Sequence, residues 1–150
     1  MISATEKHAL EGFPVAAIRF VRALERNREQ IAISNGLAAS DLRALFWVAE
    51  HASVTPKAVA EHLEMTTGAI TAITNRLSDR GFLQRVAHPH DRRSIFLELT
   101  ESGHTMMRSI HSDFTRMVSE STSSLSKREL IAFESALTRV ANEVATRTGR

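Results

Sequence analysis

The stretch from Thr55 to Leu99 constrains the fold of this 150-residue chain more than any other segment. Thr55-Pro56 is typical of a helix start, because threonine caps a helix and proline fits its first turn. Glu64 and Met65 then separate two short apolar patterns, and Thr66 or Thr67 can cap the second of them. The inward residues recur at helical spacing: Val59, Ala60 and Leu63, then Ile70, Ile73 and Leu77. The segment therefore predicts two helices joined by a tight turn.

A hairpin is predicted directly after these helices. Gly81 ends the second helix, and Phe82–Val86 and Ser94–Leu99 have the alternation of two strands. The tip between them, 87–93, reads A-H-P-H-D-R-R, and Asp91 beside two arginines can hold one guanidinium in a fixed pose. A narrow minor groove attracts such an arginine. The whole predicts a winged helix-turn-helix within a mainly α chain that has one small β-hairpin (α+β).

The outer face of the second helix lacks the charged residues that surface helices usually carry. Small, hydroxyl and amide side chains there suit close approach to base edges: Thr67, Gly68, Thr71, Ala72 and Asn75. The structural alternatives are a helix buried on both sides and a merely solvated charged turn at 87–93. We rank the DNA-binding interpretation first, because the basic tip follows the helix-turn-helix directly.

Composition narrows the remaining classes of function. The net charge is only +2, from 19 Lys and Arg against 17 Asp and Glu. The case for a nucleic-acid partner therefore rests on where the arginines lie and not on the total charge. No cysteine is present, which excludes disulfides and thiolate metal sites. We find no P-loop, G-x-S-x-G, dinucleotide fingerprint or H-E-x-x-H motif, so we expect neither an enzyme nor a cofactor or metal site. No signal peptide or membrane-spanning run is recognised, and a cytoplasmic location is expected.

Helical patterns flank the central segment. Val15 to Ile33 is amphipathic and ends at Asn35-Gly36. Ser40 is the predicted cap of the next helix, whose expected buried face is Leu42, Leu45, Phe46 and Ala49, with Trp47 packing on a neighbouring element. Another helix opens at Thr100-Glu101, and a break is expected over Ser119 to Ser124. Ser126 and Glu129 then form a capping box. A heptad-like seam follows: Leu130, Phe133, Leu137, Val140 and Val144.

With these patterns in place, the chain resembles the MarR family of transcriptional regulators. The matching segments are Leu42–Leu45, Thr55–Leu63, Thr67–Leu77, Arg80–Leu83 with Arg85, Pro89–Arg93 and Leu99–Gly103. The sequence departs from the family in having Ala72 where arginine is frequent and Asn75 where aspartate is frequent. The lack of cysteine argues against the peroxide-sensing branch.

The resemblance implies a homodimer that binds a pseudo-palindromic operator in double-stranded DNA, more often as a repressor. It implies an N-terminal arm and dimerisation helix (1–36), a winged helix-turn-helix domain (37–100) and C-terminal dimerisation helices (101–150). The expected recognition-helix residues are Thr66, Thr67, Gly68, Thr71, Asn75 and Arg76. The expected wing residues are Arg85, His90, Asp91, Arg92 and Arg93.

Many members of this family bind a small aromatic effector that releases DNA. The resemblance makes Arg22, Phe46, Trp47 and His51 candidate lining residues of such a pocket, although each has a structural interpretation as well. Two other functions stay open: a winged helix that binds only proteins, and a regulator that responds to a metal through some of the seven histidines. The first would show no salt-dependent DNA affinity, and the second needs three or four converging ligands.

Overall fold

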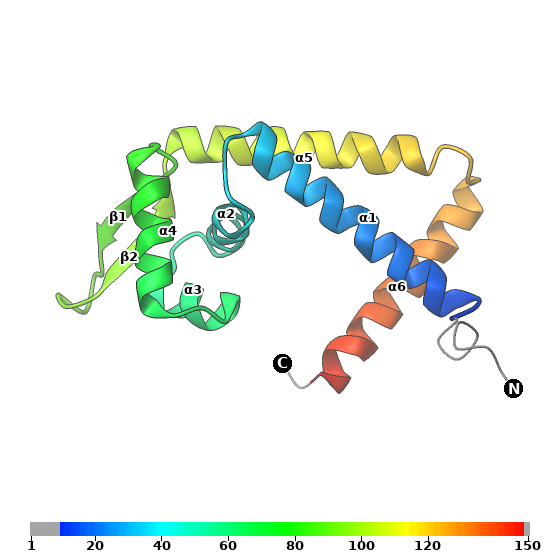
Figure 1. Ribbon diagram of the computed structural model, residues 1–150, viewed down its shortest axis with the longest axis horizontal. Coiled ribbons are helices and arrows are strands. Elements are labelled where there is room, and N and C mark those ends of the chain that lie inside the picture. The colour runs from blue at the N-terminus through cyan, green and yellow to red at the C-terminus, as the bar shows by residue number, and fades with distance from the viewer. Residues whose placement is uncertain (1–9, 149–150) are drawn as a thin grey trace, which may run out of the picture. The chain divides into compact units, whose positions relative to one another are not determined.

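The computed structural model describes residues 10–148, so most of the predicted N-terminal arm lies outside the described residues. The chain forms two compact units, Met1–Met107 and Arg108–Arg150. The first contains α1 (Phe13–Ser34), α2 (Ala39–His51), α3 (Pro56–Leu63), α4 (Thr67–Asp79), β1 (Leu83–Ala87) and β2 (Ile95–Leu99). The second contains most of α5 (Glu101–Ser121) and all of α6 (Lys127–Arg147). The predicted fold class, mainly helical with one hairpin, is confirmed (Figure 1).

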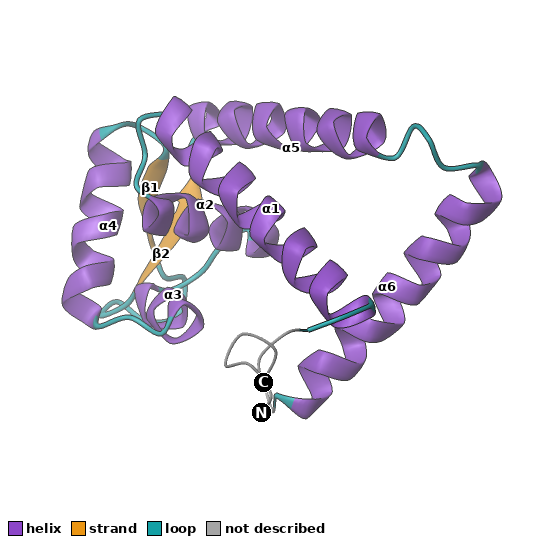
Figure 2. Cartoon of the chain, turned by 45° about the vertical axis from the view of Figure 1, so that its right-hand side comes forward, coloured by secondary structure: helices purple, strands orange, loops and turns teal. Residues whose placement is uncertain are grey.

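The core of the first unit lies where α2, α3 and α4 meet the hairpin (Figure 2). Its fully buried side chains are Leu42, Leu45, Val48, Val59, Ile70, Ile73, Leu77 and Leu97. The inward faces predicted for α3 and α4 are therefore confirmed at these positions. On α2 the prediction was partly wrong, because Ala44 and Val48 are buried whereas Phe46 and Ala49 are only half-buried.

The strands pair antiparallel, with Leu83 opposite Leu99 and Ala87 opposite Ile95. Each strand begins one residue later than the sequence pattern predicts. Val54, between α2 and α3, adds a single antiparallel bridge to Leu97. The hairpin thus rests against the helix-turn-helix through Leu97 and Leu99, the two buried residues on one face of β2.

Helix ends follow local chemistry with one exception. Thr55 and Thr66 cap α3 and α4 by accepting from the backbone N–H groups of Ala58 and Ala69, each at 3.2 Å. The predicted Ser40 cap of α2 was wrong: the helix begins at Ala39 with Ala38 in the cap position. Asp41 in the first turn reaches back and accepts from the Ala38 N–H at 3.3 Å, which fixes the helix start at this point.

The second unit is a pair of helices joined by a short turn. The expected break lies later than predicted, because α5 continues to Ser121 and α6 begins at Lys127. The capping box is confirmed, with Ser126 Oγ accepting from the Glu129 N–H and the Glu129 carboxylate accepting from the Ser126 N–H at 2.8 Å. Hydrogen bonds from the Ser126 side chain and backbone lower the pKa of Glu129. Within residues 10–148, no helix has both the length and the apolar character needed to cross a membrane.

Candidate nucleic-acid interface

The exposed face of α4 is polar and almost uncharged. Thr67, Gly68, Thr71, Ala72 and Asn75 are all exposed, while Ile70, Ile73 and Leu77 are buried on the other face. The alternative that α4 is buried on both sides is therefore wrong for this chain. Two of the hydroxyls are already committed within the helix, because Thr66 Oγ1 accepts from Ala69 N–H and Thr71 Oγ1 donates to the Thr67 carbonyl at 2.9 Å.

Arg76 differs from the other predicted recognition residues because its guanidinium has a protein partner. Its Nη2 lies 2.6 Å from Asp41 Oδ1 and its Nε lies 3.4 Å from Oδ2. Asp41 is only 4% exposed, so the pair joins the start of α2 to the last turn of α4. The hydrogen bond and the charge of Asp41 raise the pKa of Arg76. The pattern within one helix contains no sign of this partner, because the two residues are 35 positions apart.

A second arginine, Arg80, ties the end of α4 to the end of α1. Its Nη1 donates to the Gly36 carbonyl and its Nη2 donates to the Asn35 carbonyl at 3.0 Å. These carbonyls follow the last turn of α1, where the helix dipole favours a cation. Gly36 has a φ of +64°, which makes the predicted left-handed stop of α1 and lets its carbonyl meet the guanidinium.

The hairpin tip is organised by His88, which lies within the predicted tip but was not among the wing residues expected to contact DNA. His88 Nδ1 accepts from the backbone N–H groups of His90 and Asp91, at 3.2 and 3.1 Å, and its ring packs on Phe96. Asp91 Oδ1 accepts from the Arg93 backbone N–H at 2.9 Å. The expectation that Asp91 would hold a guanidinium was thus wrong in detail, because the carboxylate holds the backbone of Arg93. The side chains of Arg92 and Arg93 are exposed at the tip.

Arg85 lies on β1 and contacts α4. Its Nη2 is 2.5 Å from Asn75 Oδ1 and 3.5 Å from Thr74 Oγ1. The structure therefore joins one predicted wing residue and one predicted recognition residue in a single contact.

Two of the four effector-pocket candidates lie together in a stack of rings. Trp47 packs on His51, with centroids 3.7 Å apart, and on His62 of α3, with centroids 3.6 Å apart and planes within 14°. His62 had not been predicted in this role. Trp47 Nε1 is buried, and no atom of the described residues accepts its hydrogen. Phe46 is half-buried and Arg22 is exposed on α1.

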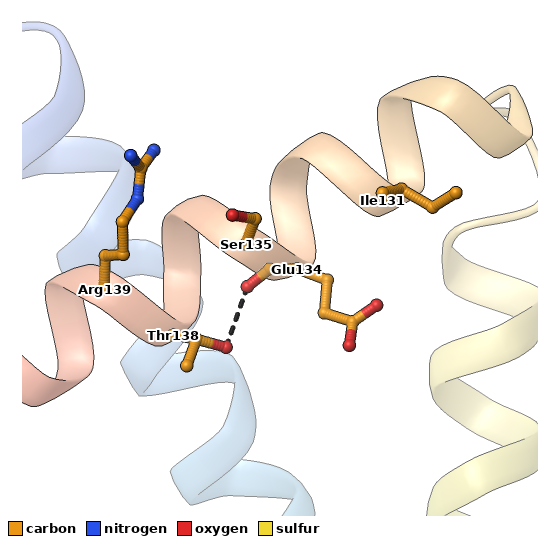
Figure 3. A pocket seen from close by; sticks show the side chains of 5 residues that line it. All are labelled: Ile131, Glu134, Ser135, Thr138 and Arg139. Carbon is orange, nitrogen blue, oxygen red and sulfur yellow. Dashed lines mark hydrogen bonds between the residues drawn. The ribbon is translucent and has the colours of Figure 1, made fainter.

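No group of three or more potential metal ligands occurs within residues 10–148. A separate shallow hollow on α6 is lined by Ile131, Glu134, Ser135, Thr138 and Arg139 (Figure 3). All five lining residues belong to α6, so no other element contributes a residue to the lining of this hollow.

The fold and the polar face of α4 beside a basic hairpin tip define a winged helix-turn-helix protein of the DNA-binding class. Comparison with known proteins gives a family match over part of the chain. The MarR family profile matches residues 35–94. An uncharacterised HTH-type transcriptional regulator of Mycobacterium bovis is 27% identical over 103 residues, which is 69% of this chain and 72% of the relative.

Solved structures share the fold over most of the chain. A MarR family protein from Bacillus stearothermophilus has a TM-score of 0.77 at 20% identity and covers 91% of this chain and 99% of its own. A Staphylococcus aureus MepR mutant bound to an oligodeoxyribonucleotide has a TM-score of 0.66 at 19% identity, covering 89% and 99%. The segment 35–94, which contains the helix-turn-helix, matches the MarR family, and the chain is similar to HTH-type transcriptional regulators.

Proposed function

We propose that the protein is a repressor that binds a pseudo-palindromic operator as a homodimer, with α4 in the major groove and the wing tip in the adjacent minor groove. The observation that carries this proposal is the exposed, uncharged polar face of α4 beside the exposed Arg92 and Arg93. A charged helix face would be the ordinary solution for a surface helix, whereas short polar side chains let the helix backbone approach base edges. The contacts we assign to α4 are Thr66, Thr67, Gly68, Thr71 and Asn75.

The dimer is supported by apolar side chains that the single chain leaves exposed. The seam of α6 exposes Leu130, Phe133, Leu137, Val140 and Val144, and α1 exposes Phe13, Phe20 and Val21. Exposed apolar faces of this extent mark protein interfaces. A second copy is the proposed occupant, because a two-fold dimer presents two α4 helices to successive major grooves about one helical turn apart. The divisions proposed from the sequence, 1–36, 37–100 and 101–150, assign the flanking helices to this dimer.

The test is a fluorescence-anisotropy titration of the protein against its own upstream intergenic DNA and a scrambled duplex, at two salt concentrations. Sequence-selective binding that weakens with salt is expected, because arginine contacts to phosphates release counterions. Weak binding that is equal on both duplexes, followed by failure to enrich any sequence from random DNA, would overturn the proposal in favour of a protein-binding winged helix.

The wing assignment has its own variant. Arg93→Ala is expected to weaken operator binding by about 1–3 kcal/mol if Arg93 enters the groove. Arg139→Ala is the matched control, because it removes the same exposed side chain from α6. Equal operator affinity for wild type and Arg93→Ala would contradict the wing assignment.

We also propose that a small aromatic effector binds beside Trp47 and releases the protein from DNA. Its support is the Trp47 stack, where a buried indole N–H lacks an acceptor among the described residues. A phenolic or carboxylate oxygen would satisfy that N–H. Trp47 is the only tryptophan, so its fluorescence reports binding directly. Compounds that change this emission and also release the labelled duplex would support the assignment, and release without any change in emission would place the effector elsewhere.

A further inference from the structure

The contact between Arg85 and Asn75 determines which atoms of Asn75 are available to DNA. Arg85 leaves β1 and reaches the last turns of α4, where its Nη2 lies 2.5 Å from Asn75 Oδ1. The same nitrogen lies 3.5 Å from Thr74 Oγ1, and Thr74 is a buried residue whose hydroxyl donates to the Thr71 carbonyl at 3.1 Å. The Thr74 hydroxyl therefore turns a lone pair, and not its hydrogen, toward the guanidinium.

The orientation of the Asn75 amide follows from chemistry. A guanidinium has five donors and no acceptor, so only the oxygen of the amide can form this short contact. The amide is planar, and its NH₂ group lies on the opposite side from its oxygen. Asn75 is exposed on the same face as Thr67 and Thr71, so it presents N–H donors on that face while its oxygen is occupied.

An amide held in this way reads DNA differently from a free one. A free asparagine recognises adenine with two bonds, one to N6–H₂ through its oxygen and one to N7 through its nitrogen. With the oxygen turned toward Arg85, the groups of the amide that face outward are its two N–H donors. Guanine offers two neighbouring acceptors in the major groove, N7 and O6, whereas cytosine presents a donor there. The donor-only amide matches guanine best and cytosine worst.

We propose that Arg85 is a positioning residue that orients the Asn75 amide, and that this pair selects guanine at one position of the DNA site. The inference rests on the proposed function, because it requires α4 to lie in the major groove. It changes the role expected for Arg85 from a wing contact with DNA to a residue that acts through Asn75.

The experiment is selection from random double-stranded DNA with the full-length protein, in parallel for wild type and four variants. Asn75→Asp keeps an oxygen facing Arg85 and replaces the outward donors with an acceptor. Arg85→Met removes the group that donates to Asn75 Oδ1, whereas Arg85→Lys keeps a donor at this position. Asn142→Asp introduces the same charge change at an exposed position of α6. Thermal melting of each variant verifies that it folds.

The wild type is expected to enrich guanine at one position that Asn75→Asp shifts toward cytosine, by roughly ten-fold or more in relative affinity. Arg85→Met should admit adenine at that position alone, and Arg85→Lys and Asn142→Asp should keep the wild-type preference. A uniform loss of affinity in Arg85→Met would overturn the inference by making Arg85 a phosphate contact. Unchanged preferences in every variant would do the same. A wild type that enriches no sequence would instead overturn the proposed function.

Discussion

At the scale of single residues, ion pairs and amides decide how α4 is held. Arg76, Arg80 and Arg85 each bond to the protein, to Asp41, to the end of α1 and to Asn75 respectively. Arg76 and Arg85, which were predicted to contact DNA, therefore also hold the helix. Because these three contacts fix α4, its polar face keeps one position. Less conformational entropy is then lost when this face binds a partner.

Asp41 is the residue whose removal tests this support. Asp41→Ala is expected to destabilise the chain by about 1 kcal/mol through the lost helix-start interaction alone, and further through the lost partner of Arg76. Asp41→Asn is the matched variant, because its amide oxygen can still accept from Ala38 N–H. Urea unfolding measures both. Equal stability of Asp41→Ala and wild type would mean that neither contact contributes.

At the scale of elements, the start of α5 is locked onto the end of α4. Thr100 Oγ1 donates to the Gly81 carbonyl at 2.5 Å and accepts from the Gly103 N–H at 3.0 Å. The Thr100 N–H donates to the Phe82 carbonyl at 3.1 Å. The motif L-T-E-S-G, which contributed to the family resemblance, therefore has a structural reason: threonine caps the helix and glycine allows close approach of the Phe82 backbone.

Gly103→Ala tests that close approach. An added Cβ would lie 2.2 Å from the Phe82 carbonyl oxygen and 3.3 Å from Leu99 Cδ2, so the backbone of one element must shift. A loss of about 1–3 kcal/mol in the free energy of unfolding is expected, as for other overpacked sites. Gly68→Ala in α4 is the control, since its Cβ meets nothing within 4 Å. That change should stabilise the helix by about 0.5–1 kcal/mol. Two equal melting temperatures would refute the argument.

At the scale of the whole molecule, we expect a second copy of the chain to cover the exposed seam of α6. Leu137 lies in the middle of the seam and is 41% exposed in the single chain. Leu137→Glu is expected to give monomers, because a carboxylate loses its hydration when a second copy covers it. Ile131→Glu is the control on the same helix, at a residue that is 56% exposed and outside the seam. Analytical ultracentrifugation measures the mass, and a dimeric Leu137→Glu variant would place the interface elsewhere.

Much of the fold was predictable because helices and hairpins depend on neighbours within a few residues. The caps at Thr55, Thr66 and Ser126 and the inward residues of α4 follow from such patterns and are confirmed. The cap predicted at Ser40 was wrong, because Ala38 occupies the cap position and its N–H bonds to Asp41.

The order of elements, the polar face of α4 and the basic character of the wing tip could be predicted, since they depend on spacing and residue type along the chain. The side-chain partners could not be predicted and are seen only in the folded chain: Arg76 with Asp41, Arg85 with Asn75, and Trp47 with His62. The physical reason is that a hydrogen bond or ring stack needs atoms within a few ångströms of each other. Packing of the buried residues sets those distances between segments that are far apart along the chain.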